Sequence, residues 1–236
     1  MQYHWFALIS VIIFALVHIC AKFAYKLDGI IHGKLLSAGG GVAIAYVFID
    51  LLPKLGESDQ IVEKSILPIF PYFEKHVYLM ALAGFLLFFI VGQSRSYLEG
   101  NGRFWLSLLS YALFNFLVGY AVVDKNDLEV QPLALFTIAI ALHYFINDFT
   151  LTKEHGLIYE KLGKWLLIAS LFFGWFAGLW IKLPEAAVAL VSAFIGGGVI
   201  MNVTRHELPQ DSPHSLGAFL LASFVYAFIL LTIGVH

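Results

Sequence analysis

Long apolar runs follow one another along the whole chain of 236 residues, with polar punctuation at intervals of roughly 25 residues, the spacing of bilayer-spanning helices. In hydrocarbon every backbone N–H and C=O group must be paired internally, so such segments can only be helices or strands of a closed barrel. The alternation of barrel strands is absent, and the runs are too long for them. The sequence therefore predicts an all-α membrane protein with about eight transmembrane helices.

Composition leaves no room for a soluble domain, because 60% of the residues are hydrophobic and only 13% are charged. We interpret residues 1–236 as a single polytopic membrane domain. The expected spans lie near residues 5–25, 34–54, 76–94, 103–123, 131–152, 164–181, 185–204 and 214–235. The stretch from Lys54 to Lys75 is expected to be a surface loop. The net charge is −2 without a block of like charges, which argues against nucleic acid as a partner.

Orientation follows from the lysines and arginines near the ends of the expected spans, because cytoplasmic loops carry an excess of them. One side has Lys22, Lys26, Lys34, Arg95, Arg103, Lys153, Lys161, Lys164 and Arg205. The other side has Lys54, Lys64, Lys75, Lys125 and Lys182. The first and larger set predicts the cytoplasmic side, which places both termini on the non-cytoplasmic side of an integral membrane protein.

Two of the expected spans resemble each other. The second span contains a glycine triplet within Ser37 to Val42 and ends at Leu51-Leu52-Pro53. The seventh span contains another triplet within Ser192 to Val199 and ends at Leu208-Pro209. A slip is needed to align them, because Phe194 and Ile195 separate Ser192-Ala193 from the second triplet. Because these spans run in opposite directions, the pattern indicates an inverted repeat of three, two and three spans, as in many secondary transporters. The alternative is that the triplets only allow close helix packing, and in either case we expect them at helix crossings.

Polar side chains near the bilayer centre are rare in this chain and are therefore candidates for function. The fourth span carries Asn115, and the fifth carries His143, Asn147 and Asp148. His143 and Asn147 share a helical face, and Asn115 is expected at the depth of His143. Imidazole, carboxylate and amide oxygen can bind a divalent metal, although interhelical hydrogen bonding would explain the same residues. At the span ends, Asp50, His206, Glu207 and His214 could line a vestibule.

Several of these motifs resemble the ZIP family of zinc and iron permeases over nearly the whole chain. The family has eight spans in a three–two–three arrangement with an inverted repeat and both termini outside. The resemblance is carried by the small-residue start at Ser37 to Gly41, the Leu51-Leu52-Pro53 end, the Gly84 to Phe88 run of the third span, and Ser192 to Pro209 of the seventh.

The resemblance places a metal site in the fourth and fifth spans, where this chain departs from the family pattern. The fourth-span motif His-Asn-x-Pro-Glu-Gly is matched at Asn115 and Gly119, without its histidine and glutamate. The fifth-span motif His-Glu-x-Pro-Glu-Gly is matched at His143, while both glutamates are lost and Asp148 lies one position later. The metal site that the resemblance implies here is thus a reduced one of Asn115, His143, Asn147 and Asp148.

The resemblance implies a ZIP-like transporter that moves a divalent metal cation of the zinc, iron or manganese class by alternating access. The alternative keeps the fold without metal transport, as a sensor, a pseudo-transporter or a carrier of another small solute. No enzyme activity is expected, because a metal-dependent hydrolase would need more than one midplane histidine. The expected partners are the lipid bilayer and a divalent metal as cargo rather than cofactor, and a homodimer is one option for the assembly.

Overall fold

A computed structural model describes residues 2–26, 29–66, 75–94, 97, 101–123, 130–206 and 215–233, and all regular structure in these ranges is helical. The helices are α1 (Gln2–Cys20), η1 (Ala21–Lys26), α2 (Gly29–Tyr46), η2 (Val47–Leu51), α3 (Leu52–Ile66), α4 (His76–Ser94), α5 (Asn101–Ala121), α6 (Val130–His155), η3 (Tyr159–Gly163), α7 (Lys164–Trp180), α8 (Glu185–His206) and α9 (Leu216–Ile233). Among the described residues, eight segments are long and apolar enough to cross a membrane. The predicted all-α class and the number of spans are confirmed.

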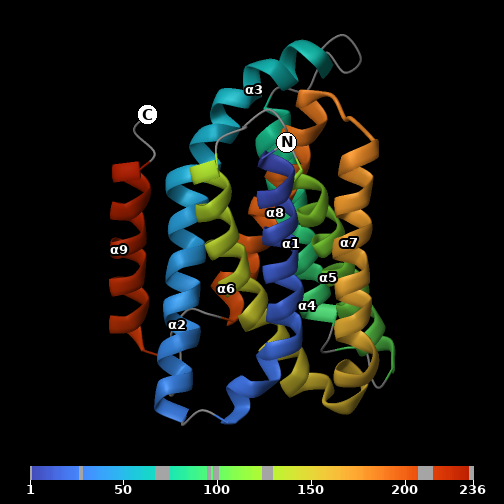
Figure 1. Cartoon of the computed structure of the whole chain (residues 1–236), viewed down its shortest axis with the longest axis vertical. Coiled ribbons are helices and arrows are strands. Elements are labelled where there is room, and N and C mark those ends of the chain that lie inside the picture. The colour runs from blue at the N-terminus through green and yellow to red at the C-terminus, as the bar shows by residue number, and fades with distance from the viewer. Residues whose placement is uncertain are drawn as a thin grey trace.

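The second span does not end at Pro53, and the expected surface loop after Lys54 is wrong in its first half. Proline has no N–H and clashes with the carbonyl group of the preceding turn. The chain widens before it into the π-helical turn η2, where the N–H of Leu52 bonds to the carbonyl group of Val47. It then continues as α3 to Ile66, which extends across one end of the bundle (Figure 1).

The membrane helices pack mainly in four pairs: α4 with α8, α5 with α7, α2 with α9 and α1 with α6. Since successive spans alternate in direction, the two members of each pair run the same way. Further contacts join α1 to α7 and α3 to both α4 and α8. We call α1, α5, α6 and α7 the first helix group, and α2, α3, α4, α8 and α9 the second. Both chain termini lie at the end of the bundle that carries α3 (Figure 1).

The two glycine triplets lie at close helix crossings, as expected. A Cβ atom on Gly41 of α2 would lie 2.4 Å from the carbonyl oxygen of Phe219 in α9, and one on Gly197 of α8 would lie 1.8 Å from that of Ala81 in α4. Both neighbours are backbone atoms, which cannot rotate away. Only glycine therefore permits these two helix pairs to approach so closely.

We predict that Gly197→Ala lowers the free energy of unfolding in detergent by about 1–3 kcal/mol, since the added methyl group must push α8 away from α4. Gly217→Ala is the control, because nothing lies within 4 Å of a Cβ atom at that position of α9. Thermal and chemical unfolding of the two variants measures the difference. Equal losses in both would contradict the close packing of α8 on α4.

Candidate functional site

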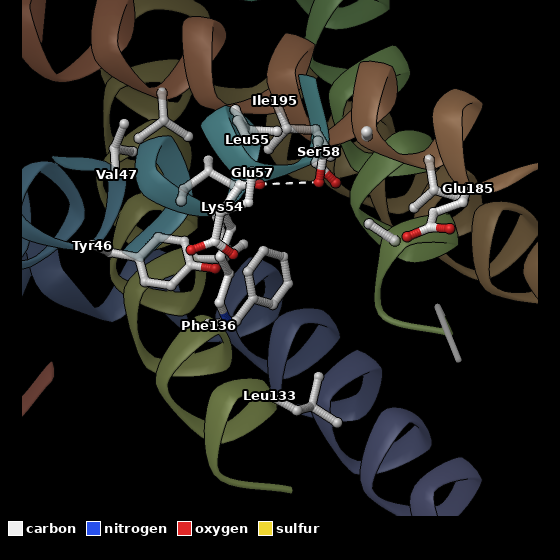
Figure 2. A pocket seen from close by; sticks show the side chains of 17 residues that line it. Tyr46, Val47, Lys54, Leu55, Glu57, Ser58, Leu133, Phe136, Glu185 and Ile195 are labelled. Carbon is white, nitrogen blue, oxygen red and sulfur yellow. Dashed lines mark hydrogen bonds between the residues drawn. The ribbon is translucent and has the colours of Figure 1, made fainter. Parts of the chain in front are cut away.

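A cavity of about 400 Å³ opens at the α3 end of the bundle, between the two helix groups (Figure 2). The second group contributes residues of α2, η2, α3 and α8, and the first contributes Ala121 of α5 with Leu133, Phe136 and Ile140 of α6. The volume lies within the range of small-molecule sites, about 300–1,000 Å³. The cavity is therefore large enough for a ligand and touches both groups.

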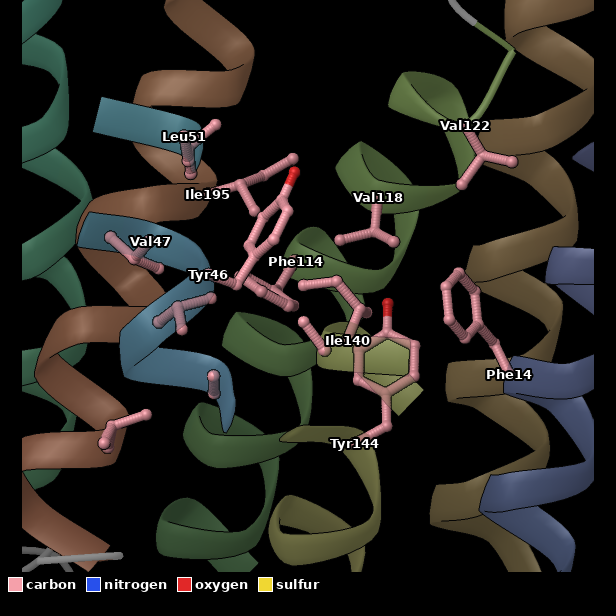
Figure 3. Close-up of a cluster of buried hydrophobic side chains, with 14 of the residues drawn as sticks. Phe14, Tyr46, Val47, Leu51, Phe114, Val118, Val122, Ile140, Tyr144 and Ile195 are labelled. Atoms are coloured by element: carbon pink, nitrogen blue, oxygen red, sulfur yellow. The ribbon is translucent and has the colours of Figure 1, made fainter. Parts of the chain in front are cut away.

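Buried apolar side chains cluster beside this cavity (Figure 3), and Val47, Leu51, Ile140 and Ile195 of the cluster also line it. On α6, Phe136, Ile140, Tyr144 and Asp148 follow one another at i,i+4 spacing and so share one helical face. The first two line the cavity, whereas Tyr144 is buried between the rings of Phe14 and Phe114. Asp148, one turn further, is fully buried.

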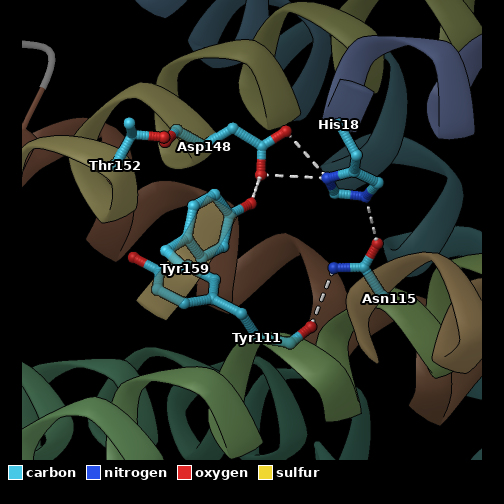
Figure 4. Close-up of polar contacts among 6 residues, drawn as sticks. All are labelled: His18, Tyr111, Asn115, Asp148, Thr152 and Tyr159. Carbon is cyan, nitrogen blue, oxygen red and sulfur yellow. Dashed lines mark hydrogen bonds and ion pairs between the residues drawn. The ribbon is translucent and has the colours of Figure 1, made fainter. Parts of the chain in front are cut away.

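Asp148 is the centre of a buried polar cluster formed by His18, Asn115, Asp148 and Tyr159 (Figure 4). The Nδ1 atom of His18 lies 2.7 and 2.9 Å from the two carboxylate oxygens of Asp148. The Nε2 atom of His18 lies 2.8 Å from Oδ1 of Asn115. His18, Asn115 and Asp148 are exposed by 3%, 1% and 0%, so the three interactions are shielded from solvent. Helices α1, α5 and α6 meet at this cluster.

The hydrogen-bond directions constrain where the protons of the cluster lie. The amide nitrogen of Asn115 donates to the carbonyl oxygen of Tyr111 at 2.9 Å, so its oxygen faces His18 and must accept a hydrogen from Nε2. One further proton lies between Nδ1 of His18 and the Asp148 carboxyl group, so the pair carries no net charge whichever of the two groups holds that proton. A pair without net charge is the arrangement that makes such groups tolerable in a membrane.

The loop after α6 brings Tyr159 back to Asp148. Gly156 follows the helix with a φ of +53°, a conformation that glycine adopts readily, and its N–H bonds to the carbonyl group of Thr152 at 2.8 Å. The chain then enters the π-helical turn η3, which begins at Tyr159. The Tyr159 hydroxyl donates to the Asp148 carboxylate, so the first turn of the sixth span closes the cluster from the end opposite the cavity.

The side chain of Tyr144 covers the cluster on the cavity side. Its ring stacks on that of His18, with centroids 4.8 Å apart and planes at 30°. Its hydroxyl points along α6 toward Ile140 (Figure 3) and is buried without a hydrogen-bond partner among the described residues. A buried, unbonded hydroxyl costs about 1–3 kcal/mol, so phenylalanine would be the more stable choice here.

A second hydrogen-bond chain connects the two helix groups beside the cluster. The amide nitrogen of Asn202 in α8 donates to the side-chain oxygen of Asn147, and the hydroxyl of Tyr111 donates to Oδ1 of Asn202 at 3.0 Å. All three side chains are buried. Asn202 thereby attaches α8 of the second group to α5 and α6 of the first.

The four predicted metal-site residues occupy one buried region but divide between these two networks. Asn115 and Asp148 both contact His18, whereas Asn147 belongs to the chain through Asn202. The ring of His143 is 1% exposed and packs against Phe114, with centroids 5.6 Å apart. Neighbouring residues of a helix point about 100° apart, which explains why Asn147 and Asp148 face different partners.

Of the expected vestibule residues, Asp50 and His206 lie at opposite ends of the bundle. Asp50, in η2 near the cavity end, pairs with Lys54 at 3.3 Å, and Lys54 lines the cavity. His206 ends α8, whose first residue is at the cavity end, so it lies at the opposite end. Its side chain, and both Glu207 and His214, lie outside the described residues.

Sequence reasoning missed His18, Tyr159 and Asn202. His18 and Asn202 could have been found by the rule that selected His143, because each is a polar residue inside an apolar run. Tyr159 carried no such signal, since it lies in a short polar connection. Its role arises only when the turn at Gly156 directs it back against α6.

The cluster offers an imidazole, a carboxylate, an amide oxygen and a phenol, all of which can coordinate a borderline metal. In the described part of the chain, no three histidine, cysteine, aspartate or glutamate side chains lie close enough together to hold a metal ion. A metal here would therefore rely on Asn115 or Tyr159 beside His18 and Asp148.

Comparison of the chain with models of protein families, with curated proteins and with solved structures finds no match.

We predict that Tyr144→Phe raises the free energy of unfolding in detergent by about 1 kcal/mol, because it removes a buried hydroxyl without a partner. Tyr226→Phe is the matched control: the Tyr226 hydroxyl donates to the carbonyl oxygen of Leu135 at 2.6 Å, and its loss should lower that free energy by a similar amount. Chemical unfolding of both variants checks the opposite signs. If Tyr144→Phe destabilises as much as Tyr226→Phe, the Tyr144 hydroxyl forms a hydrogen bond.

Proposed function

We propose that this chain is a ZIP-like membrane transporter that moves a divalent metal cation, of the zinc, iron or manganese class, by alternating access. The observation that carries this proposal is the buried contact of His18, Asn115 and Asp148 within membrane-spanning helices. Ionisable groups at such depth are costly, and in membrane proteins they mark the routes of ions and solutes.

An inverted repeat is part of the proposal, and the pattern of helix contacts supports it. The repeat exchanges α1 with α7, α2 with α8, α4 with α9, and α5 with α6. Under this exchange the pair α4–α8 becomes α9–α2, α5–α7 becomes α6–α1, and α2–α6 becomes α8–α5, and every one of these contacts is present. Gly41 of α2 against α9 likewise becomes Gly197 of α8 against α4, in the same backbone contact.

The two helix groups supply a route for alternating access. His18, Asn115, Asp148 and Tyr159 all belong to the first group, and the cavity lies between the groups on the α3 side of the cluster. In the described structure Ile140 and Tyr144 separate the cavity from the cluster. Movement of the first group against the second would expose the cluster to one side or the other.

Metal binding would require a change in the ion pair. A ring nitrogen of His18 can ligate only after it has lost its proton, so the dication would replace that proton beside the Asp148 carboxylate. One carboxylate compensates only part of a double charge. The site therefore favours borderline metals that accept imidazole nitrogen over calcium or magnesium, which require more oxygen ligands.

The alternative function is a ZIP-like protein that does not transport metal, as a sensor, pseudo-transporter or carrier of another small solute. One observation favours it: His18, Asn115 and Asp148 already satisfy one another, without a third histidine, cysteine, aspartate or glutamate beside them among the described residues. Transport assays separate the two functions.

We predict that purified protein in liposomes takes up zinc, iron or manganese but not magnesium, and that Asp148→Asn abolishes this uptake. The substitution keeps the shape of the side chain and removes its charge. The same metal should raise the unfolding temperature of the wild type but not of Asp148→Asn, because stabilisation by a ligand is lost with its binding.

Thr137→Val is the matched control for this assay. Thr137 is another buried polar residue of α6, bonded to Ser10 of α1 at 2.7 Å and remote from the cluster. Its substitution should lower stability and leave uptake per folded protein unchanged. If the wild-type protein neither transports any of these metals nor is stabilised by them, the metal-independent alternative is the one that stands.

We further propose that the end bearing both termini faces the non-cytoplasmic side, from the lysine and arginine count. Tyr97 lies 86% exposed between α4 and α5, at the end of the bundle opposite the termini. With the chain's only cysteine removed, a Cys20→Ala/Tyr97→Cys variant should react with a membrane-impermeant maleimide in inside-out vesicles but not in intact cells. A Cys20→Ala/Ser58→Cys variant, altered at the cavity end, should show the reverse. If the two variants showed each other's expected labelling pattern, the protein would have the opposite orientation.

A further inference from the structure

The cavity between the helix groups differs in chemistry from the polar cluster. Its inner wall is aliphatic, with Ile140 and Val199 among its residues. A bare metal ion would lose its hydration shell there without gaining ligands in exchange. The inner cavity therefore suits an apolar group rather than an inorganic ion.

The outer part of the cavity is acidic. Glu57 of α3 and Glu185 at the start of α8 line it and are exposed, and among the described residues neither forms an ion pair. Lys54, which also lines the cavity, is paired with Asp50. The charge that remains for a ligand is therefore negative.

Two aromatic rings complete the wall between these regions. Tyr46 of α2 and Phe136 of α6 both line the cavity, with ring centroids 5.8 Å apart at 66°. Ring faces attract cations, most strongly those that shed water easily, such as substituted ammonium groups. From the inside outward, the cavity has an aliphatic wall, then aromatic rings, then an acidic rim. An amphiphilic cation has matching parts in the same order, an apolar tail followed by a charged head.

We propose that this cavity is a binding site for an amphiphilic organic cation, a substituted ammonium with an apolar tail. The tail lies against Ile140 and Val199, and the ammonium group lies near Phe136 and the Glu57 and Glu185 carboxylates. Such a ligand contacts both helix groups and holds them in the arrangement described here. The inference goes beyond metal transport and does not depend on it.

The test uses unfolding temperatures of the full chain in detergent, titrated with hexyltrimethylammonium. We expect saturable stabilisation, because a ligand that binds only the folded state stabilises it. Tetramethylammonium has the charge without the tail, and 1-hexanol has the tail without the charge. Each should bind at least about tenfold more weakly than hexyltrimethylammonium, since each loses one of the two contributions.

A double variant, Glu57→Gln with Glu185→Gln, should weaken hexyltrimethylammonium about tenfold and leave 1-hexanol unchanged. Glu63→Gln is the control, because Glu63 is on the same helix α3 and does not line the cavity. Equal affinity of the wild type for the cation and the alcohol would overturn the proposal. It would also be overturned if the double variant bound the cation like the wild type, or if Glu63→Gln weakened binding equally.

Discussion

The burial of the Asp148 carboxylate is a physical constraint that the surrounding helices must satisfy. A charged side chain within the membrane-spanning region costs several kcal/mol unless hydrogen-bond donors surround it. His18 and Tyr159 supply those donors, from α1 and from the π-helical turn before α7. The positive φ of Gly156 and the turn at η3 place Tyr159 against α6, and the packing of α1 on α6 places His18 there, so that both contact this carboxylate.

The helix pairs and the boundary between the two groups are held by different kinds of contact. Within the second group, Gly41 and Gly197 bring α2 and α8 against the backbone of α9 and α4, and such contacts allow little relative movement. Across the boundary, Gly39 of α2 packs closely on α6, but against the side chain of Ile146 rather than backbone. Asn202 and Tyr226 add side-chain hydrogen bonds, and the cavity interrupts the packing. This difference favours movement of the groups as bodies over rearrangement within them.

The spans could be predicted from sequence because the length and hydrophobicity of a membrane helix are local properties. The continuation of the second span through Pro53 into α3 could not, since it depends on a π-helical turn that no composition signal announces. Polarity within apolar spans and the family resemblance brought Asn115 and Asp148 into one candidate site, but the histidine that joins them is His18 rather than His143. The partner of a buried group depends on which helices pack together. That pairing of α1 with α6 is a tertiary property with no trace in the local sequence.

The face of α6 that carries Phe136, Ile140, Tyr144 and Asp148 connects the cavity to the polar cluster in steps of one helical turn. Three of these residues have an evident role in the described arrangement, as cavity wall or ion-pair partner. The Tyr144 hydroxyl does not, because it bears the cost of burial without a hydrogen bond. A buried hydroxyl without a partner is consistent with a second arrangement of the helices in which this hydroxyl forms a hydrogen bond. In the alternating-access proposal, that arrangement is the one in which Ile140 no longer covers Tyr144. The Tyr144 hydroxyl is then the first polar group that a solute meets on its way from the cavity to the cluster.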